Sequence, residues 1–370
     1  MTYHSRILIL TAGYGEGHLL ASIALKEHFL KLGVEFVQVI DLMQEAHPVI
    51  NKISCNVYKG SFGAARYGFN YYGWSYYLTQ DAKSHNPLLT VLNRLGYRHL
   101  KNIVSNYHPD VIINTFPYGA APAVGRAFGI PTYTIITDYV IHARWLHPHI
   151  HKYYVATNEL KRDMLNVGIH ESHIEVTGIP VREAFETNQR IHKNRKMVLL
   201  FASSHPNGEL TEELIKKLQF IDGYHLTVVC GRNKKLEQIL NNRFDNFPNV
   251  TIYGFVEQIT ELMSQASCII SKAGGLTLAE SLTLQIPVFI YRPFPGQEKD
   301  NAIYFSRKGA AAISHDINHL LEQIERFLTN SSYAKRLKSQ MAALNQTKAA
   351  DTIVKDILKN LYDRKSATYS

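Results

Sequence analysis

The stretch Ser271-Lys-Ala-Gly-Gly-Leu-Thr-Leu-Ala-Glu280 decides how the rest of this chain is interpreted. It follows Cys268-Ile-Ile270, which we expect to end a buried strand, and its two glycines allow a tight turn without a Cβ clash. A helix beginning there exposes N–H groups that have no intrahelical partner, and such groups bind anions. Glu280 lies about one helical turn further on, where its carboxylate can accept hydrogen bonds from a diol attached to that anion.

The residues after this helix continue the same pattern. Ile286-Pro-Val-Phe-Ile-Tyr291 is expected to be a buried strand, and Pro295-Gly-Gln-Glu-Lys-Asp-Asn301 a polar loop at its carboxyl end. Open α/β sheets bind their ligands at that edge. The two stretches together predict a nucleotide-diphosphate site with a polar cluster for an attached group. The alternative is an ordinary βαβ turn whose glycines only permit close packing.

Length and composition indicate a globular protein of two domains. The chain has 370 residues, 45% hydrophobic and 19% charged, which is enough for two cores and is not typical of disorder. Cys55, Cys230 and Cys268 are few and unpatterned, so we expect a reducing compartment, no disulfide framework and no zinc site. Arg6 runs directly into a first strand, so no signal peptide is expected, and no apolar run has the length of a membrane span.

The net charge of +9 points to an anionic partner, either nucleic acid or the negative cytoplasmic surface of a membrane. Positive charge is concentrated in residues 51–107. Aromatic side chains are interleaved there with lysines and arginines, and Asp81 is the only acidic residue of the segment. Amphipathic rings beside cations suit a lipid headgroup interface. Helical core packing or base stacking would use similar residues, although no nucleic-acid module motif occurs. The aromatic residues of interest include Tyr67, Tyr71, Tyr72 and Trp74.

The first strand, Arg6-Ile-Leu-Ile-Leu-Thr11, leads into a glycine-rich turn, Ala12-Gly-Tyr-Gly-Glu-Gly-His18, and then a helix. The glycine spacing does not fit the dinucleotide fingerprint and no P-loop lysine follows, so neither NAD nor ATP is predicted. His18 stands at the mouth of the turn, where a neutral imidazole can act as a base. The alternative is a surface histidine that caps the helix start.

A second group of polar residues follows the strand Pro131-Thr-Tyr-Thr-Ile-Ile-Thr137. Asp138 could orient a base or bind a hydroxyl group, or it could simply cap a helix or a turn. His142 and Trp145 follow it closely, and further along the chain Asn158 could cap a helix at Glu159–Val167. The histidines of this region lack metal-ligand spacing, and no Asp-x-Asp motif follows a strand, so we expect no metal ion at the site.

Strands and helices alternate in two successive halves, which predicts an α/β protein of two doubly wound, Rossmann-like domains facing a cleft. The polar run from Glu183 to Lys196 is the best candidate for a linker. We expect an N-terminal domain at 1–185, a linker at 186–196, a C-terminal domain at 197–345, and a C-terminal helix with a polar tail at 346–370.

Short motifs occur in a characteristic order along nearly the whole chain: Thr11–His18, Asn114-Thr-Phe-Pro117, Thr137-Asp138, Tyr153-Tyr-Val-Ala-Thr157, Thr177-Gly-Ile-Pro-Val-Arg182, Lys272-Ala-Gly-Gly-Leu-Thr277 with Glu280, and Pro295-Gly-Gln-Glu298 with Asn301. On these motifs the chain resembles the lipid-acting members of glycosyltransferase family 28. These include the processive diacylglycerol glucosyltransferases of Gram-positive bacteria, the plant monogalactosyldiacylglycerol synthases and, more distantly, the peptidoglycan lipid N-acetylglucosaminyltransferases.

The resemblance implies the GT-B fold and inverting transfer of a hexose, with glucose preferred over galactose, from a UDP-sugar to diacylglycerol, singly or processively. It implies a UDP-sugar co-substrate without a further cofactor, anionic membrane lipids rather than nucleic acid as partners, and a peripheral place at the cytoplasmic face of the cell membrane. The alternatives are a peptidoglycan-precursor N-acetylglucosaminyltransferase, a UDP-sugar 2-epimerase, and a non-catalytic protein that binds nucleotide-sugars or other anionic partners.

The resemblance also implies residue roles. His18 would be the catalytic base or an acceptor-site residue, and 51–107 the lipid-accepting insertion. As a base, His18 could be steadied by Asp138. The UDP-sugar would be bound by Gly17, Arg232, Asn233, Phe255, Val256, Gly274, Gly275, Thr277, Glu280, Gln297, Glu298 and Asn301. The acceptor and membrane would meet Tyr67, Tyr71, Tyr72, Trp74, His142 and Trp145. One departure is the loop Ala202-Ser-Ser-His-Pro-Asn-Gly208, which is usually richer in glycine and which puts its handling of the donor in doubt.

Overall fold

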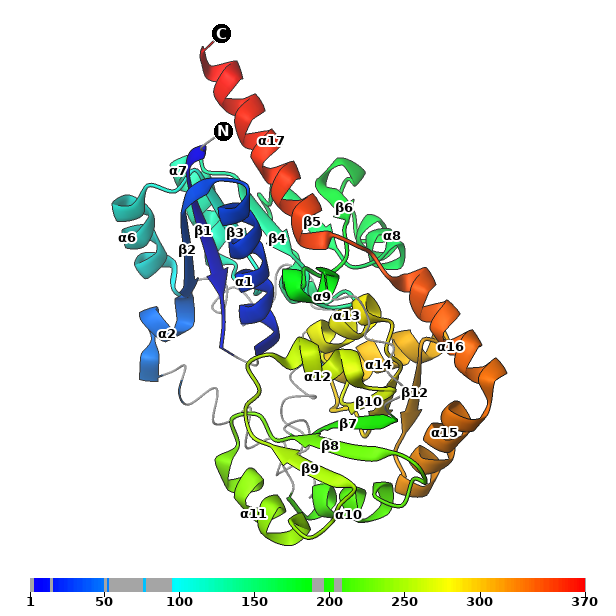
Figure 1. Cartoon of the computed structure of the whole chain (residues 1–370). Coiled ribbons are helices and arrows are strands. Elements are labelled where there is room, and N and C mark those ends of the chain that lie inside the picture. The colour runs from blue at the N-terminus through cyan, green and yellow to red at the C-terminus, as the bar shows by residue number, and fades with distance from the viewer. Residues whose placement is uncertain are drawn as a thin grey trace. The chain divides into compact units, whose positions relative to one another are not determined.

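The computed structural model describes residues 3–13, 16–49, 52, 76–77, 95–187, 196–202 and 208–369. These residues form two compact units, each built on a parallel six-stranded sheet (Figure 1). The first unit contains β1 to β6 and the final helix α17, and the second contains β7 to β12 with α10 to α16. The expected α/β class is therefore confirmed. Of the helices described, none is both long enough and apolar enough to cross a membrane.

The strands of the first unit are β1 (Tyr3–Thr11), β2 (Val34–Asp41), β3 (Val111–Asn114), β4 (Thr132–Ile135), β5 (Lys152–Val155) and β6 (Ile174–Val176). Its helices are α1 (Glu16–Lys31), α2 (Leu42–Ala46), α6 (Tyr97–Tyr107), α7 (Ala120–Phe128), η2 (Ala143–Trp145), α8 (Asn158–Asn166), η3 (Glu171–His173) and α17 (Ala349–Tyr369). Helix α9 (Glu183–Thr187) spans the boundary between the units.

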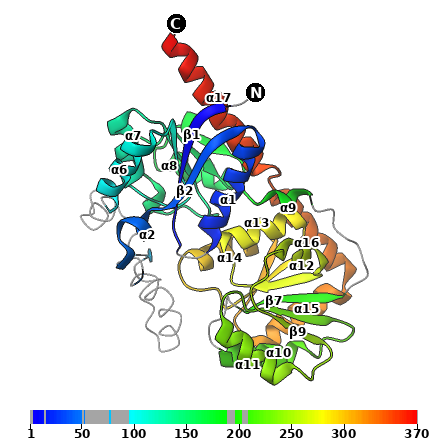
Figure 2. The same ribbon diagram turned by 60° about the vertical axis from the view of Figure 1, so that its left-hand side comes forward.

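The first sheet has the order β2-β1-β3-β4-β5-β6 and is covered on both faces (Figure 2). Successive side chains of a strand point to opposite faces, so Ile7 and Ile9 of β1 face one way while Leu8 and Leu10 face the other. The first pair packs against α1 and α17, and the second pair packs against α6 and α7. This double burial explains why β1 reads as an unbroken apolar run.

The second sheet has the order β12-β11-β10-β7-β8-β9. Its strands are β7 (Met197–Phe201), β8 (His225–Val229), β9 (Val250–Tyr253), β10 (Cys268–Ser271), β11 (Val288–Tyr291) and β12 (Ala311–Ser314). Its helices are α10 (Gly208–Leu218), α11 (Lys234–Phe244), α12 (Ile259–Gln265), α13 (Gly275–Leu284), α14 (Gln297–Arg307), α15 (Ile317–Thr329) and α16 (Ser331–Leu344). Apolar side chains of α10, α11 and α15 pack on one face of this sheet.

Helix α17 completes the first unit although it comes last in the sequence. Its Asp356 carboxylate accepts hydrogen bonds from Lys152 Nζ at 2.9 Å and from Tyr154 Oη at 2.6 Å. The chain that enters α17 passes close to Gly178, whose φ of 87° favours glycine and where a Cβ would lie 2.7 Å from Gln346 Cβ. The backbone is helical to Tyr369, so the terminal residues that we expected to be a polar tail continue the helix.

A smaller correction concerns the start of α8. We expected Asn158 to cap this helix, but the cap is Thr157, whose hydroxyl accepts the Leu160 N–H at 3.2 Å. Threonine and asparagine both serve this role, so composition could not separate two adjacent candidates.

Ile357 of α17 offers a test of this packing because its side chain is fully buried in the first core. We expect Ile357→Ala to lower the free energy of unfolding of the first unit by about 2–5 kcal/mol, since it removes buried methyl groups and leaves a cavity. Urea unfolding followed by tryptophan fluorescence, which the buried Trp145 reports from this unit, measures the change. Lys359→Ala, at an exposed position of the same helix, is the control. Equal midpoints for the two variants would contradict the role assigned to α17.

Candidate functional site

Three neighbouring strands of the first sheet end at one edge and carry polar residues just beyond their carboxyl ends. β1, β3 and β4 are adjacent and parallel. His18 lies in the first turn of the helix that follows β1, Thr115 directly follows β3, and Thr137 lies just beyond β4. β2 flanks β1 on the opposite side, so the strand order reverses between β1 and β3, which is where α/β sheets bind ligands.

The imidazole of His18 is held in one tautomer. Its Nδ1 lies 2.8 Å from the carbonyl oxygen of Thr115 and 2.9 Å from Oγ1 of Thr137. A carbonyl oxygen only accepts hydrogen bonds, so Nδ1 carries the hydrogen and donates it, and Nε2 keeps the lone pair. The Thr137 hydroxyl oxygen accepts from the same N–H group. His18 therefore presents a proton acceptor at Nε2.

The charge state of His18 follows from its surroundings. Burial lowers the pKa of His18 to about 4, the hydrogen bond to the Thr115 carbonyl opposes that shift, and the positive charge of Arg144 adds a smaller lowering. Burial acts in this direction because it penalises the charged form. The ring is therefore neutral near pH 7, which is the form that accepts a proton.

Two aromatic rings lie beside the His18 imidazole. Phe116 meets it edge-on with 5.1 Å between ring centroids, and the Trp145 ring lies 6.2 Å away. The indole Nε1 of Trp145 donates to Oδ2 of the buried Asp138 at 3.4 Å. The Asp138 carboxylate thus contacts Trp145, whose ring lies beside the imidazole, whereas the hydrogen bonds described at Nδ1 go to Thr115 and Thr137. Both threonines belong to motifs quoted from the sequence, but neither was assigned to the site. Their signal was a threonine within two residues of a strand's carboxyl end.

His142 is held in the opposite tautomer. Its Nδ1 accepts the Arg144 backbone N–H at 3.1 Å as the cap of η2, and its Nε2–H donates to the Tyr76 carbonyl at 3.0 Å. The centroids of the His142 and Tyr76 rings lie 4.3 Å apart. Tyr76 belongs to the aromatic and basic segment, so His142 joins that segment to the site. The other residues expected there, Tyr67, Tyr71, Tyr72 and Trp74, lie outside the described residues.

In the second unit, the turn after β10 has the shape expected of an anion site. Ala273 is left-handed, with a φ of 77°, which is uncommon for a residue with a Cβ and points to a constrained turn. Gly274 caps α13, and the helix begins at Gly275, so its first N–H groups point out of the helix end. Thr277 lies in this first turn, and the Glu280 side chain is buried about one turn further on. β10 is flanked by β7 and β11, so this turn also stands where the strand order reverses.

The polar residues after β11 lie beside this turn. Lys272 Nζ pairs with Glu298 Oε1 at 3.2 Å, and both side chains are mostly buried. The Asn301 side-chain amide donates to the Ala273 carbonyl at 3.5 Å. Gln297, Glu298 and Asn301 were expected in a loop, but they form the start of α14. The correction has a local cause: Gly296, with a φ of 105°, turns the chain just before the helix, and acidic residues suit its first turn.

The remaining residues of this unit that are expected to bind the nucleotide-sugar follow β8 and β9. The Arg232 guanidinium lies 4.1 Å from the centroid of the Phe255 ring, which is 47% exposed and can therefore meet a ligand. Val256 follows Phe255 and is partly exposed. Asn233 caps α11 by accepting the Leu236 N–H at 3.1 Å, a structural role that differs from the expected contact with the nucleotide-sugar. Gly17 adjoins His18 in α1 of the first unit.

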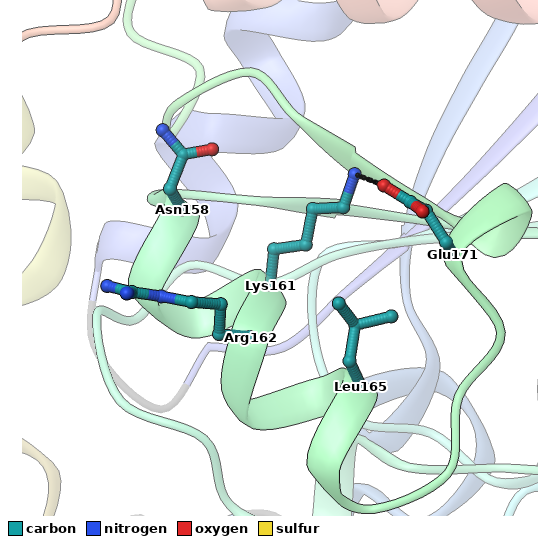
Figure 3. Close-up of a pocket in the computed structure, with 5 residues that line it drawn as sticks. All are labelled: Asn158, Lys161, Arg162, Leu165 and Glu171. Atoms are coloured by element: carbon teal, nitrogen blue, oxygen red, sulfur yellow. Dashed lines mark ion pairs between the residues drawn. The ribbon is translucent and has the colours of Figure 1, made fainter.

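The first unit also contains an open depression of about 480 Å³ along α8 (Figure 3). Asn158, Lys161, Arg162, Leu165 and Glu171 line it, and Lys161 Nζ pairs with Glu171 Oε1 at 2.8 Å. None of these residues was expected to be functional. The part of the chain that the structure describes holds no group of three or more His, Cys, Asp or Glu residues that could bind a metal ion.

Comparison with known families accounts for both halves of the chain. Residues 18–181 match the family described as monogalactosyldiacylglycerol (MGDG) synthase. Residues 201–357 match the glycosyltransferase family 28 C-terminal domain. The chain is 34% identical to the processive diacylglycerol beta-glucosyltransferase of Bacillus subtilis, over 97% of this chain and 96% of that protein. It is 35% identical to the protein of the same description from Bacillus thuringiensis, over 97% of this chain and 95% of that protein.

Solved structures share the fold at lower identity. Acinetobacter baumannii MurG aligns with a TM-score of 0.63 and 18% identity, covering 96% of this chain and 99% of that one. A UDP-GlcNAc 2-epimerase from Neisseria meningitidis aligns with a TM-score of 0.60 and 15% identity, covering 96% and 100%. The two doubly wound units are thus those of the GT-B fold. The chain belongs to glycosyltransferase family 28, and within that family its relatives include processive diacylglycerol beta-glucosyltransferases.

His147 allows the effect of burial on histidine titration to be measured near the site. Burial lowers the pKa of His147 to about 4, and Arg144 lowers it further. An unfolded chain binds the proton near pH 6.5, so the buried neutral ring stabilises the fold above that pH and the contribution is lost as the pH falls towards 4. When the pH is lowered from 7 to 5, the free energy of unfolding should fall by roughly 2 kcal/mol more in wild type than in His147→Leu, because only wild type has this histidine to protonate on unfolding. Urea unfolding at both pH values measures the difference, and identical losses would contradict the assigned burial.

Proposed function

We propose that this glycosyltransferase moves a hexose from a UDP-sugar to the free hydroxyl group of diacylglycerol and inverts the anomeric centre. The observation that carries the substrate assignment is the relation to curated diacylglycerol beta-glucosyltransferases at 34% identity over 97% of the chain. The geometry of the His18 imidazole supports the reaction type, because an acceptor hydroxyl must lose a proton to become a nucleophile.

The proposed reaction is a single displacement. The acceptor oxygen attacks the anomeric carbon, and the bond from that carbon to the diphosphate oxygen breaks, with its electron pair leaving on UDP. The hydroxyl proton passes to Nε2 of His18, whose Nδ1–H already donates to the Thr115 carbonyl. Attack opposite to the leaving group converts an α-linked donor into a β-glycoside.

The second unit carries groups that suit the departing UDP. We assign the diphosphate to the turn at Gly274, Gly275 and Thr277, because the exposed N–H groups and dipole of α13 stabilise negative charge. Arg232 adds a fixed cation beside the half-exposed Phe255 ring, which we assign together with Val256 to the uracil. Glu280 is assigned to the ribose hydroxyls, and Gln297 and Glu298, with Asn301 nearby, to the transferred sugar.

We also propose that the enzyme is peripheral and works at the cytoplasmic face of the cell membrane, since diacylglycerol resides in the bilayer. The net charge of +9 supports attraction to anionic lipids. His142 contributes through its contact with Tyr76, which joins the first unit's site to the aromatic and basic segment proposed to meet the lipid.

Glucose is the proposed sugar because the curated relatives are named for it. Galactose is the second candidate, favoured by the match of residues 18–181 to the monogalactosyldiacylglycerol synthase family. The two sugars differ only at C4, so a carboxylate or amide such as Glu298 or Gln297 can hydrogen-bond to either epimer.

Incubation with radiolabelled UDP-glucose or UDP-galactose and diacylglycerol vesicles, with lipids resolved by chromatography, tests this function. We expect a labelled β-glucosyl lipid from UDP-glucose, and His18→Ala should lower its formation by roughly 10²–10⁴-fold, the usual worth of a general base. Calorimetry should show UDP binding to be retained in the variant. His4→Ala, at an exposed position on β1, is the control. No lipid product from either donor would refute the substrate, and normal transfer by His18→Ala would refute the base.

Glu280 is the residue on which donor recognition can be tested. We expect Glu280→Ala to weaken UDP-glucose binding by roughly 10- to 100-fold, because hydrogen bonds to a charged group are stronger than neutral ones. Isothermal calorimetry measures the affinity, and circular dichroism checks that the buried substitution leaves the fold intact. Glu280→Gln should retain part of the affinity, and Glu322→Ala, exposed on α15, should retain all of it. Unchanged affinity in folded Glu280→Ala would remove Glu280 from the ribose site.

A further inference from the structure

The hydrogen-bond partners of the His18 imidazole distinguish this site from a base paired with a carboxylate. Nδ1 donates to the backbone carbonyl of Thr115 at 2.8 Å and to the Thr137 hydroxyl at 2.9 Å. Both threonines are almost fully buried; Thr115 lies just beyond β3, which neighbours β1, and Thr137 lies just beyond β4, which neighbours β3. The two acceptors are neutral, so they orient the ring without supplying a negative charge.

The Thr115 carbonyl is itself held in place. The Thr115 N–H donates to the Leu10 carbonyl at 3.0 Å, and its Oγ1 lies 3.1 Å from the His18 backbone carbonyl and 2.8 Å from Ser22 Oγ. Ser22 Oγ in turn donates to the same His18 carbonyl at 3.0 Å. Thr115 therefore contacts His18 at both its main chain and its ring, and ties the start of α1 to the ends of β1 and β3.

We infer that Thr137 and Thr115 are positioning residues, which fix His18 in the Nδ1–H tautomer so that the lone pair of Nε2 faces the acceptor hydroxyl. This inference rests on the proposed role of His18 as the base. Without these partners the proton could move to Nε2, and a ring in that tautomer has no lone pair available there. The Phe116 and Trp145 rings complete the restraint by limiting rotation of the imidazole.

Thr137 can be tested by side-chain substitution, because its hydroxyl makes the bond. Thr137→Val keeps the shape and removes the hydrogen-bond acceptor. We expect kcat for transfer to fall on the order of 5- to 10-fold, the worth of about one hydrogen bond, while KM for the UDP-sugar stays unchanged. Thr137→Ser restores the hydroxyl and should restore kcat.

The chain offers a matched control on the preceding strand. Thr134 is also buried, and no described residue forms a hydrogen bond with its Oγ1. Thr134→Val makes the same chemical change close to Thr137 and should leave kcat at the wild-type value. A loss of kcat in both variants would show a packing effect and overturn the positioning role.

A spectroscopic measurement separates tautomer from packing. In full-length protein with ¹⁵N-labelled histidine, we assign the His18 signals as those missing from His18→Gln. Wild type should show a protonated Nδ1 and an unprotonated Nε2 at pH 7, and Thr137→Val should shift both signals towards a mixture of tautomers. Unchanged signals and unchanged kcat in Thr137→Val would overturn the inference and leave the proposed function standing. Full activity of His18→Gln would instead refute the proposed base.

Discussion

Parallel pairing of the central strands is the constraint on which the candidate residues of each unit depend. β1 pairs with β3, and β10 pairs with β7, each in parallel register. Parallel strands need crossover helices, so their carboxyl ends gather at one edge of the sheet. In both sheets the strand order reverses at such a pair. His18, Thr115 and Thr137 meet at this edge in the first unit, and the Ala273–Gly275 turn occupies it in the second.

The two units carry different electrostatic properties at these edges. In the first unit, buried threonines and aromatic rings hold a neutral imidazole, and burial keeps the pKa of His18 low. In the second unit, a helix N-terminus and Arg232 offer positive charge to an anion, while Lys272 neutralises the Glu298 carboxylate nearby. A proton acceptor and an anion site are the two functions that transfer from a diphosphate donor requires.

Much of this architecture could be predicted from the residues. Apolar runs such as Ile7–Leu10 and Cys268–Ile270 form central strands, and Gly274-Gly275 marks the start of α13 as expected. The start of α14 was mistaken for a loop because Pro295-Gly-Gln-Glu298 has the composition of a turn, but only Pro295 and Gly296 of this stretch precede the helix. The cap of α8 was placed one residue late for a comparable reason, since two good cap residues are adjacent.

The surroundings of His18 show where prediction from sequence ended. His18 was recognisable because it follows a strand and a glycine-rich turn, and that signal is local. Its partners Thr115 and Thr137 lie 97 and 119 positions away, and a pairing over such distances arises only when β1, β3 and β4 become neighbours. Asp138 is adjacent to Thr137 in the sequence, and its carboxylate accepts a hydrogen bond from the Trp145 indole.

The sequence by itself determined the order of strands and helices, the two halves of the chain and the residue types at each strand end, because hydrophobic periodicity and glycine placement act over a few residues. Only the tertiary structure decided which strand ends become neighbours, which tautomer His18 adopts, and that α17 returns to complete the first core. Those outcomes depend on hydrogen bonds and packing between residues far apart in the chain, which form only once the sheet is assembled.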